Sequence, residues 1–272
     1  MKKNDPRYII RYYFNRLCKY SVQVRRDYNK NIIHLFRVDV KKLRAFLRML
    51  RGGIKEPELL KFSHKFKKMY SLTGNIRDRQ LCLKRIKEFD GTKNKKLENR
   101  ISGLEEEIKQ LKEKKDSFLS KKEFSEIEKK IIEITPVEIQ DGLLKNFISQ
   151  KLEAIREIIA KGQFKDKELH AIRKSIKDMV YINRIYRDNI QSPLPFLFWG
   201  NDELKNAEDI SHLLGLFNDA CIALSFVKPA DYKKYHGKEK QSLVLLRRKW
   251  LGEKRELKGE IKNSLLIIKW NF

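Results

Sequence analysis

The sequence is short of the residues that cross-link, bend or interrupt a chain. Among 272 residues there are only 3 cysteines, 6 prolines and 12 glycines. Cys18, Cys82 and Cys221 lie far apart and are odd in number, which excludes a disulfide framework and a Cys-x-x-Cys metal pair. Few cysteines also indicate a reducing, cytoplasmic location. Because chain breakers are rare and no segment alternates β-branched with polar residues between turns, the sequence predicts an all-α protein.

Long apolar runs are missing as well. Arg7 and Arg11 occupy the region where a secretory signal would have its apolar core, and no run approaches the roughly 20 residues of a membrane span. We therefore expect a soluble protein that does not insert into membranes. With 41% hydrophobic residues, the chain has enough apolar surface to bury one large core or two modest ones.

Acidic residues are also few relative to basic ones. The chain has 62 Lys and Arg against 36 Asp and Glu, which leaves a net charge of +26. Such a surplus destabilises a folded chain through self-repulsion, so it is better explained by a polyanionic partner. Nucleic acid, an anionic membrane surface and polyphosphate are the candidates.

What the chain does contain is a basic pattern that occurs twice, beginning at His34 and again at His170. Successive members follow at offsets of 3, 7, 10 and 14 residues in the first copy and 3, 7 and 14 in the second, and these offsets fall within an arc of about 80° on a helix. We call each such row of basic side chains on one helix face a rail. The first rail comprises His34, Arg37, Lys41, Arg44 and Arg48, and the second comprises His170, Arg173, Lys177 and Arg184. We expect no acid to compensate either rail. The pattern therefore predicts an anion site made from two helices.

A second pair of segments follows the rails. Gly74 and Gly215 come 40 and 45 residues after the two histidines, and each is followed four residues later by an aspartate, Asp78 or Asp219. The shared order, spacing and residue types indicate an internal duplication. We expect each glycine to lie within a helix and to permit close helix approach, and each aspartate to orient a rail cation.

Together these segments resemble the CHAD domain, the conserved histidine α-helical domain. The resemblance rests on His-x-x-Arg-Val-x-x-Lys-Lys-x-Arg from His34, His-x-x-Arg-Lys-x-x-Lys from His170 with Tyr181 after it, and the paired Gly-x-x-Arg/Asn-Asp segments. It covers roughly the whole chain. It implies two pseudo-two-fold related bundles of long antiparallel helices that bind inorganic polyphosphate in a basic central channel or cleft, with repeats at 1–164 and 165–272. Asp178 and Val180 depart from the family pattern, so we expect the first repeat to dominate binding.

Chain breakers divide the first half into expected helices. A long helix is predicted from about Arg7 to Arg51, ending at Gly52-Gly53, and a second from Glu56-Pro57 to Gly91. Residues 93–134 are rich in Lys and Glu with coiled-coil spacing. They fit either one helix or a projecting hairpin, with a capping box at Ser120 and Glu123 marking a restart.

The second half begins with a helix predicted from Thr135-Pro136 to Gly162, after which Asp166 is expected to cap the helix that carries His170. The aromatic segment Pro193–Trp199 is read as a loop folded over the second bundle, in preference to a partner-docking patch. A helix from about Asp202 to Val227 and a shorter C-terminal part, punctuated by glycines, complete the chain.

These patterns predict a protein that is not an enzyme and binds polyphosphate by exchanging condensed counter-ions for Lys and Arg. A binder of RNA or DNA backbone is the alternative, although the aromatic residues Phe36, Phe46 and Tyr181 of the rail helices are expected to pack inward instead of stacking on bases. A phosphoryl-transfer or polyphosphate-hydrolysing enzyme ranks third, because no Gly-rich phosphate loop and no acidic pair for Mg²⁺ accompanies the cations.

For the two rail histidines, phosphate contact ranks ahead of a buried structural role, and metal ligation is a distant third because cations surround both. We expect no orienting carboxylate for either histidine, no catalytic residue, no metal and no other cofactor. A monomer is favoured, in the cytoplasm or associated with polyphosphate granules. The predicted polyphosphate-binding residues are His34, Arg37, Lys41, Lys42, Arg44, Arg48, His170, Arg173, Lys174, Lys177 and Arg184.

Overall fold

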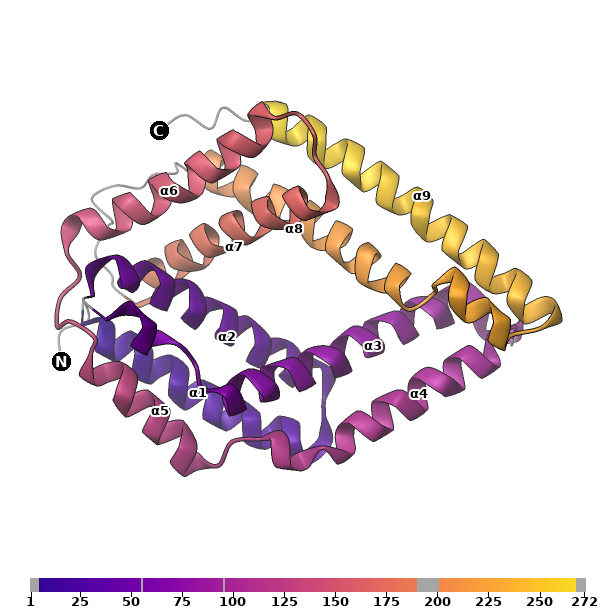
Figure 1. The fold of residues 1–272 in the computed structure, drawn as a ribbon, viewed down its shortest axis with the longest axis horizontal. Coiled ribbons are helices and arrows are strands. Elements are labelled where there is room, and N and C mark those ends of the chain that lie inside the picture. The colour runs from indigo at the N-terminus through magenta and orange to yellow at the C-terminus, as the bar shows by residue number, and fades with distance from the viewer. Residues whose placement is uncertain (1–4, 55, 95, 190–200, 268–272) are drawn as a thin grey trace.

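The described part of the chain consists of helices that close into a ring (Figure 1). The structure is a computed structural model and describes residues 5–54, 56–94, 96–189 and 201–267. These residues contain helices and no strand, which confirms the predicted all-α class. The α-helices are α1 (Pro6–Asp27), α2 (Lys30–Leu50), α3 (His64–Asn94), α4 (Glu98–Glu113), α5 (Lys121–Glu133), α6 (Asp141–Ala160), α7 (Asp166–Asn189), α8 (Asn201–Ser225) and α9 (Gly237–Ile267).

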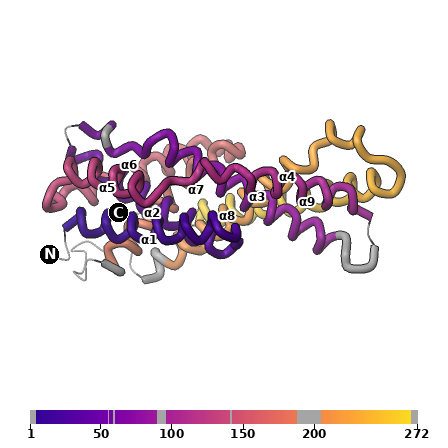
Figure 2. Tube along the Cα trace, turned by 90° about the horizontal axis from the view of Figure 1, so that it is seen from below, coloured from indigo at the N-terminus to yellow at the C-terminus, as the bar shows by residue number. Residues whose placement is uncertain are grey.

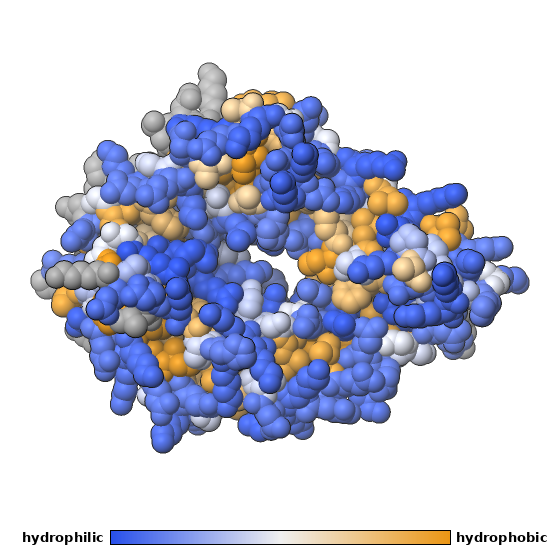
Figure 3. Space-filling view, viewed as in Figure 1, coloured by the Kyte–Doolittle hydropathy of each residue, from blue (hydrophilic) through white to orange (hydrophobic). Residues whose placement is uncertain are grey.

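Four inner helices, α2, α3, α8 and α7, form the wall of the ring. α2 packs on α3 and α7, and α8 also packs on α3 and α7, so the four helices close on themselves. Each is backed by an outer helix: α1 behind α2, α4 behind α3, α6 behind α7 and α9 behind α8. Figure 3 shows the molecule hollowed at its centre, and Figure 2 shows that the ring is flat relative to its length.

The packing order is the same in α1 to α4 as in α6 to α9, which is the order that an internal duplication predicts. The two-fold axis and the boundary between residues 164 and 165 stay predictions. α6, which that boundary assigns to the first repeat, packs on α7 of the second.

Two apolar clusters hold the helices of the ring together. The larger one includes residues of α1, α2, α3 and α5 to α9, with fully buried Phe14, Phe46 and Phe66. The smaller one joins α3, α4, α8 and α9 around Trp250 and Leu104. Each fully buried side chain of this size stabilises the fold by about 1.5–3 kcal/mol.

The predicted single helix over 7–51 was wrong, because the chain breaks between α1 and α2. Tyr28 adopts a left-handed conformation with φ of 54°, and the side chain of Asn29 accepts hydrogen bonds from the backbone N–H groups of Asn31 and Ile32. The hydroxyl of buried Tyr28 donates to the carbonyl of Lys112 at 2.7 Å. A contact with a distant segment therefore holds the break, and local spacing does not reveal it.

The Lys/Glu-rich segment forms neither one continuous helix nor a projecting hairpin. α4 packs on α3 and α5 packs on α1, and a short 3-10 turn with buried Phe118 separates them. The predicted capping box is confirmed, because Ser120 and Glu123 exchange side chain-to-backbone hydrogen bonds at the start of α5. The apolar spacing thus marks faces that pack on the ring.

Several predicted boundaries shift. The segment expected to begin a helix at Pro57 forms a short 3-10 helix (Pro57–Leu60), and α3 begins at His64. α6 begins at Asp141 instead of Thr135, whose carbonyl accepts a hydrogen bond from Arg7 Nε at 2.9 Å. α9 runs unbroken through both of its interior glycines.

Two further expectations concern α8 and the segment before it. By length and composition alone, Lys205–Lys234 is apolar enough to cross a membrane, so the expectation of no such run was wrong. α8 packs against α3, α7 and α9, and three neighbours account for apolar residues on several of its sides. Pro193–Trp199 lies outside the described residues.

Candidate functional site

The packing of α2 on α7 brings the two rails together in the ring. The Lys41 ammonium of α2 lies near Arg37 on its own helix and near Arg173 and Lys177 on α7. Burial, followed by repulsion from these three cations, lowers the pKa of Lys41 from 10.5 to about 8. Lys177 is affected in the same way, since burial and the nearby Arg173 and Arg184 lower its pKa. Cations from two helices thus form one cluster.

Arg37 is held against α3 by a glycine and a tyrosine. Its Nη1 donates to the Tyr70 carbonyl at 2.9 Å, and its guanidinium carbon lies 4.5 Å from the centre of the Tyr70 ring. A Cβ atom on Gly74 would lie 2.9 Å from the guanidinium carbon and would overlap Nη1. The expected close approach at Gly74 is therefore present, although a side chain makes it. At Gly215 the expectation was wrong, because a Cβ atom there would meet nothing within 4 Å.

The guanidinium of Arg44 packs on the same aromatic ring as that of Arg37. Its guanidinium carbon lies 4.3 Å from the centre of the Tyr70 ring and 5.6 Å from that of Phe62. Burial lowers the pKa of Arg44, and the charges of Arg48 and Arg37 act in the same direction. The contact with the aromatic ring offsets part of this penalty.

Acids from neighbouring helices compensate two rail arginines, contrary to expectation. Arg48 forms an ion pair with buried Asp178 of α7, and Lys151 of α6 lies 3.3 Å from the same carboxylate. Arg184 pairs with Glu208 of α8 at 2.7 Å. The prediction failed because it considered only acids on the same helix face as each rail, whereas Asp178 reaches Arg48 from the neighbouring helix α7 and Glu208 reaches Arg184 from α8.

The two histidines are exposed but lie among cations. Burial of the imidazole is the first cause that lowers the pKa of His34, followed by Arg77, Lys41 and Arg37. For His170 the causes are burial, then Arg173 and Lys174, while a hydrogen bond with Asn218 raises its pKa. Both shifts favour the neutral imidazole in the unbound protein.

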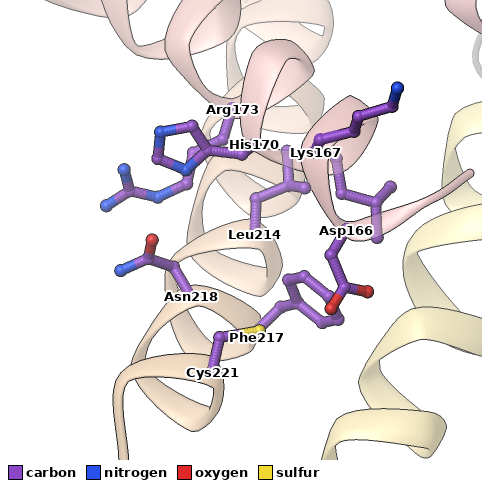
Figure 4. A pocket seen from close by; sticks show the side chains of 9 residues that line it. Asp166, Lys167, His170, Arg173, Leu214, Phe217, Asn218 and Cys221 are labelled. Atoms are coloured by element: carbon purple, nitrogen blue, oxygen red, sulfur yellow. The ribbon is translucent and has the colours of Figure 1, made fainter. Parts of the chain in front are cut away.

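A cavity of about 240 Å³ lies beside His170, between α7 and α8 (Figure 4). His170, Arg173 and Asn218 lie on one side of it, and apolar Leu214 and Phe217 lie between them and Asp166. The sequence prediction overlooked Asp166, four residues before His170, as an acid at helical spacing. Its carboxylate forms ion pairs with Lys254 and Lys258 of α9. Because α7 begins at Asp166 itself, Lys165 and not Asp166 is the residue that precedes the helix, contrary to expectation. Instead, Glu168 accepts from the backbone N–H of Lys165 at 2.6 Å.

The remaining two predicted residues lie outside the central cluster. Lys42 is near the carboxylate of Asp39, which binds Arg16 of α1 at 2.7 Å, so it lies on the α1 side of α2. Lys174 is exposed and near His170. The structure thus brings His34, Arg37, Lys41, Arg173 and Lys177 together and sets Lys42 and Lys174 at the margin.

The family model for the CHAD domain matches residues 8–228, which is most of the chain. The chain belongs to the CHAD family. Its fold is similar to that of the CHAD domain from the plant Ricinus communis, with a TM-score of 0.73 over 99% of this chain and 94% of that one. The two sequences are 12% identical, so this similarity concerns the fold alone. No curated protein matches the chain. CHAD domains are linked to polyphosphate binding in general.

The structure of this CHAD domain adds residues that the sequence prediction missed. Arg77 lies near Arg37 and His34, and burial lowers its pKa while Asp219 and Asp78 raise it. Burial raises the pKa of Asp78, against the lowering effect of Arg37. Asp78 and Asp219 therefore lie among the rail cations, as predicted for orienting acids. The sequence spacing could have identified Arg77, because this residue follows Gly74 by three positions and therefore lies on the same helix face.

Metal-binding geometry gives no further candidate in this CHAD domain. Among the residues whose placement is described, no group of three or more His, Cys, Asp or Glu side chains is arranged to hold a metal ion.

The lowered pKa of Lys41 predicts how the stability of the unbound domain depends on pH. Between about pH 8 and 10.5 the unfolded chain binds more protons at Lys41 than the folded chain does, so stability rises with pH. At about 1.4 kcal/mol per unit, the shift from 10.5 to about 8 corresponds to at most about 3.5 kcal/mol. We expect Lys41→Met to melt at a higher temperature than wild type at pH 7, and the difference to shrink toward pH 10.

Melting curves of both proteins across this range measure the effect. All other ionisable groups are common to both proteins, so their contributions largely cancel in the difference. A difference that stays constant with pH, or a less stable variant at pH 7, contradicts the prediction.

Proposed function

We propose that this CHAD domain binds linear inorganic polyphosphate along the two rails and does not hydrolyse it. The observation that carries the proposal is the cation cluster formed where α2 meets α7, in which Arg173 and Lys177 lower the pKa of Lys41 and Arg173 lowers that of Lys177. Holding like charges together in the unbound state is unfavourable, and a bound polyanion relieves this repulsion. The family's general link to polyphosphate supports the choice of ligand.

The charge distribution supports a site that is stronger in the first half. Asp178 stands where the first rail has Lys42, and Glu208, seven residues before Gly215, stands where Lys67 precedes Gly74. Asp178 neutralises Arg48 of the first rail and Glu208 neutralises Arg184 of the second, so each rail has one compensated arginine. The first half nevertheless keeps Arg44 where the second has Val180, and its Lys67 is exposed. A polyphosphate chain accordingly meets more uncompensated charge on α2 and α3.

In this proposal the arginines of the two rails make bidentate contacts to phosphate oxygens, and Lys41 and Lys177 act as point charges. Each contact releases condensed counter-ions, as in the binding of DNA by basic proteins. His34 and His170 take up a proton when phosphate arrives, because the added negative charge raises their pKa. Association with polyphosphate granules in the cytoplasm is the cellular counterpart that we propose.

Nucleic acid is the competing polyanion, and its binding is measured in parallel with that of polyphosphate. The rings of Tyr70 and Tyr181 face cations of the site. Rings engaged in this way are less available for stacking with bases, which favours a ligand without bases.

A titration of the purified domain with long-chain polyphosphate, pyrophosphate and orthophosphate tests the proposal. We expect the long chain to bind far more tightly than the short anions. Its affinity is expected to fall on the order of a thousandfold between about 50 and 200 mM salt, as for six or more phosphate contacts. Equal affinity for pyrophosphate, or a flat salt dependence, contradicts the proposal.

Two parallel measurements separate the alternatives. Tighter binding of single-stranded or duplex nucleic acid than of polyphosphate, at matched charge and near-physiological salt, supports the nucleic-acid reading. Release of orthophosphate from bound chains, with or without Mg²⁺, supports an enzyme.

A further inference from the structure

Tyr70 and Gly74 lie one turn apart on α3, and both contact Arg37. The Tyr70 carbonyl accepts a hydrogen bond from Arg37 Nη1 at 2.9 Å, and the Tyr70 ring lies under the guanidinium. The missing side chain of Gly74 leaves the space that the guanidinium occupies. Arg37 is therefore fixed by three groups: a carbonyl, a ring and a bare Cα atom.

The same ring also supports Arg44. The two guanidinium carbons lie 4.5 and 4.3 Å from the centre of the Tyr70 ring. Arg37 and Arg44 carry like charges on the same face of α2, so in the absence of support they would turn away from each other into solvent. The ring opposes that separation through its attraction for both cations.

We propose that Tyr70 and Gly74 are positioning residues that hold Arg37 and Arg44 side by side before the polyanion arrives. The inference rests on the proposed function and explains how part of that site reaches high affinity. A flexible arginine loses side-chain entropy when it binds, whereas an arginine that is already fixed loses less. Neither residue needs to touch the ligand for this effect.

The second half of the ring lacks this arrangement. Ser211 stands four residues before Gly215, where Tyr70 precedes Gly74, and a Cβ atom on Gly215 would meet no atom within 4 Å. Nε of Arg173 is buried without a hydrogen-bond partner. Gly215 therefore provides a matched control for Gly74 within the same chain.

The experiment compares Gly74→Ala with Gly215→Ala. Alanine favours helix more than glycine does, so we expect both variants to melt at or above the wild-type temperature. Gly74→Ala displaces Arg37 and is expected to weaken long-chain polyphosphate binding about tenfold and to reduce the salt slope by about one. Gly215→Ala is expected to bind as wild type does. Wild-type affinity and salt slope in Gly74→Ala overturn the inference.

Tyr70 provides an independent test if Gly74→Ala does not fold. Tyr70→Phe keeps the ring and is expected to keep the affinity, whereas Tyr70→Leu loses the ring and is expected to bind about tenfold more weakly. Equal affinity of the Phe and Leu variants overturns the role of the ring.

Failure of this inference differs from failure of the proposed function. If wild type binds polyphosphate and all variants match it, only the positioning role is wrong. If wild type does not bind, the proposed function is wrong, and the NMR signal of the Arg37 Nε–H still reports positioning. That signal is expected to show a rigid side chain in wild type and a mobile one in Gly74→Ala, and equal mobility overturns the inference.

Discussion

Simultaneous replacement of Arg37 and Lys41 by alanine is expected to weaken polyphosphate binding on the order of a hundredfold. The pair lies where both rails meet, and each contact of a charged group with a phosphate oxygen contributes about 1.5–3 kcal/mol. Titration of the variant with long-chain polyphosphate at fixed salt measures the loss.

Two control pairs make the result specific. Arg173→Ala with Lys177→Ala removes the corresponding residues of the second rail and is expected to have a smaller effect, because Glu208 already pairs with Arg184 and lies near Lys177. Lys129→Ala with Lys130→Ala removes two exposed cations from α5 and is expected to change affinity little. Circular dichroism is expected to show wild-type helicity for all three. Equal losses in the two rail pairs support a symmetric channel and contradict the dominance of the first repeat.

Asp178→Asn is expected to destabilise the domain by about 2 kcal/mol. The buried carboxylate joins three helices, because it binds Arg48 of α2 and Lys151 of α6 from its own position on α7. Removing its charge leaves two cations uncompensated, and their partial exposure keeps the loss below that of a fully buried pair. Urea unfolding at pH 7 measures the change.

The same substitution is expected to raise polyphosphate affinity, because it frees Arg48 and adds one positive charge near the rails. Asp209→Asn on α8 removes one exposed carboxylate and serves as the charge control, with little expected change in stability. A stability loss in Asp178→Asn accompanied by weaker binding would show that Asp178 orders the binding residues, which our account does not predict.

The sequence by itself determined the helical class, the family and the identity of most central cations. His34, Arg37 and Lys41 fall on one helix face through their spacing alone. Because a helix has a fixed periodicity, such a face can be recognised from the sequence without tertiary information. The recurrence of the pattern at His170, with a glycine and an aspartate downstream, was equally local. Repeated local patterns are the kind of signal that a single sequence carries.

Only the tertiary structure decided which of these residues act together. Tyr28 breaks the first predicted helix because its hydroxyl meets the carbonyl of Lys112 across 84 residues. Asp178 neutralises Arg48 across 130 residues, so the supposed absence of compensating acid was wrong. Gly74 accepts a guanidinium whereas Gly215 faces open space, although both occur in the same motif. Contacts between distant helices depend on how whole faces pack, and the spacing of residues within one helix does not contain that information.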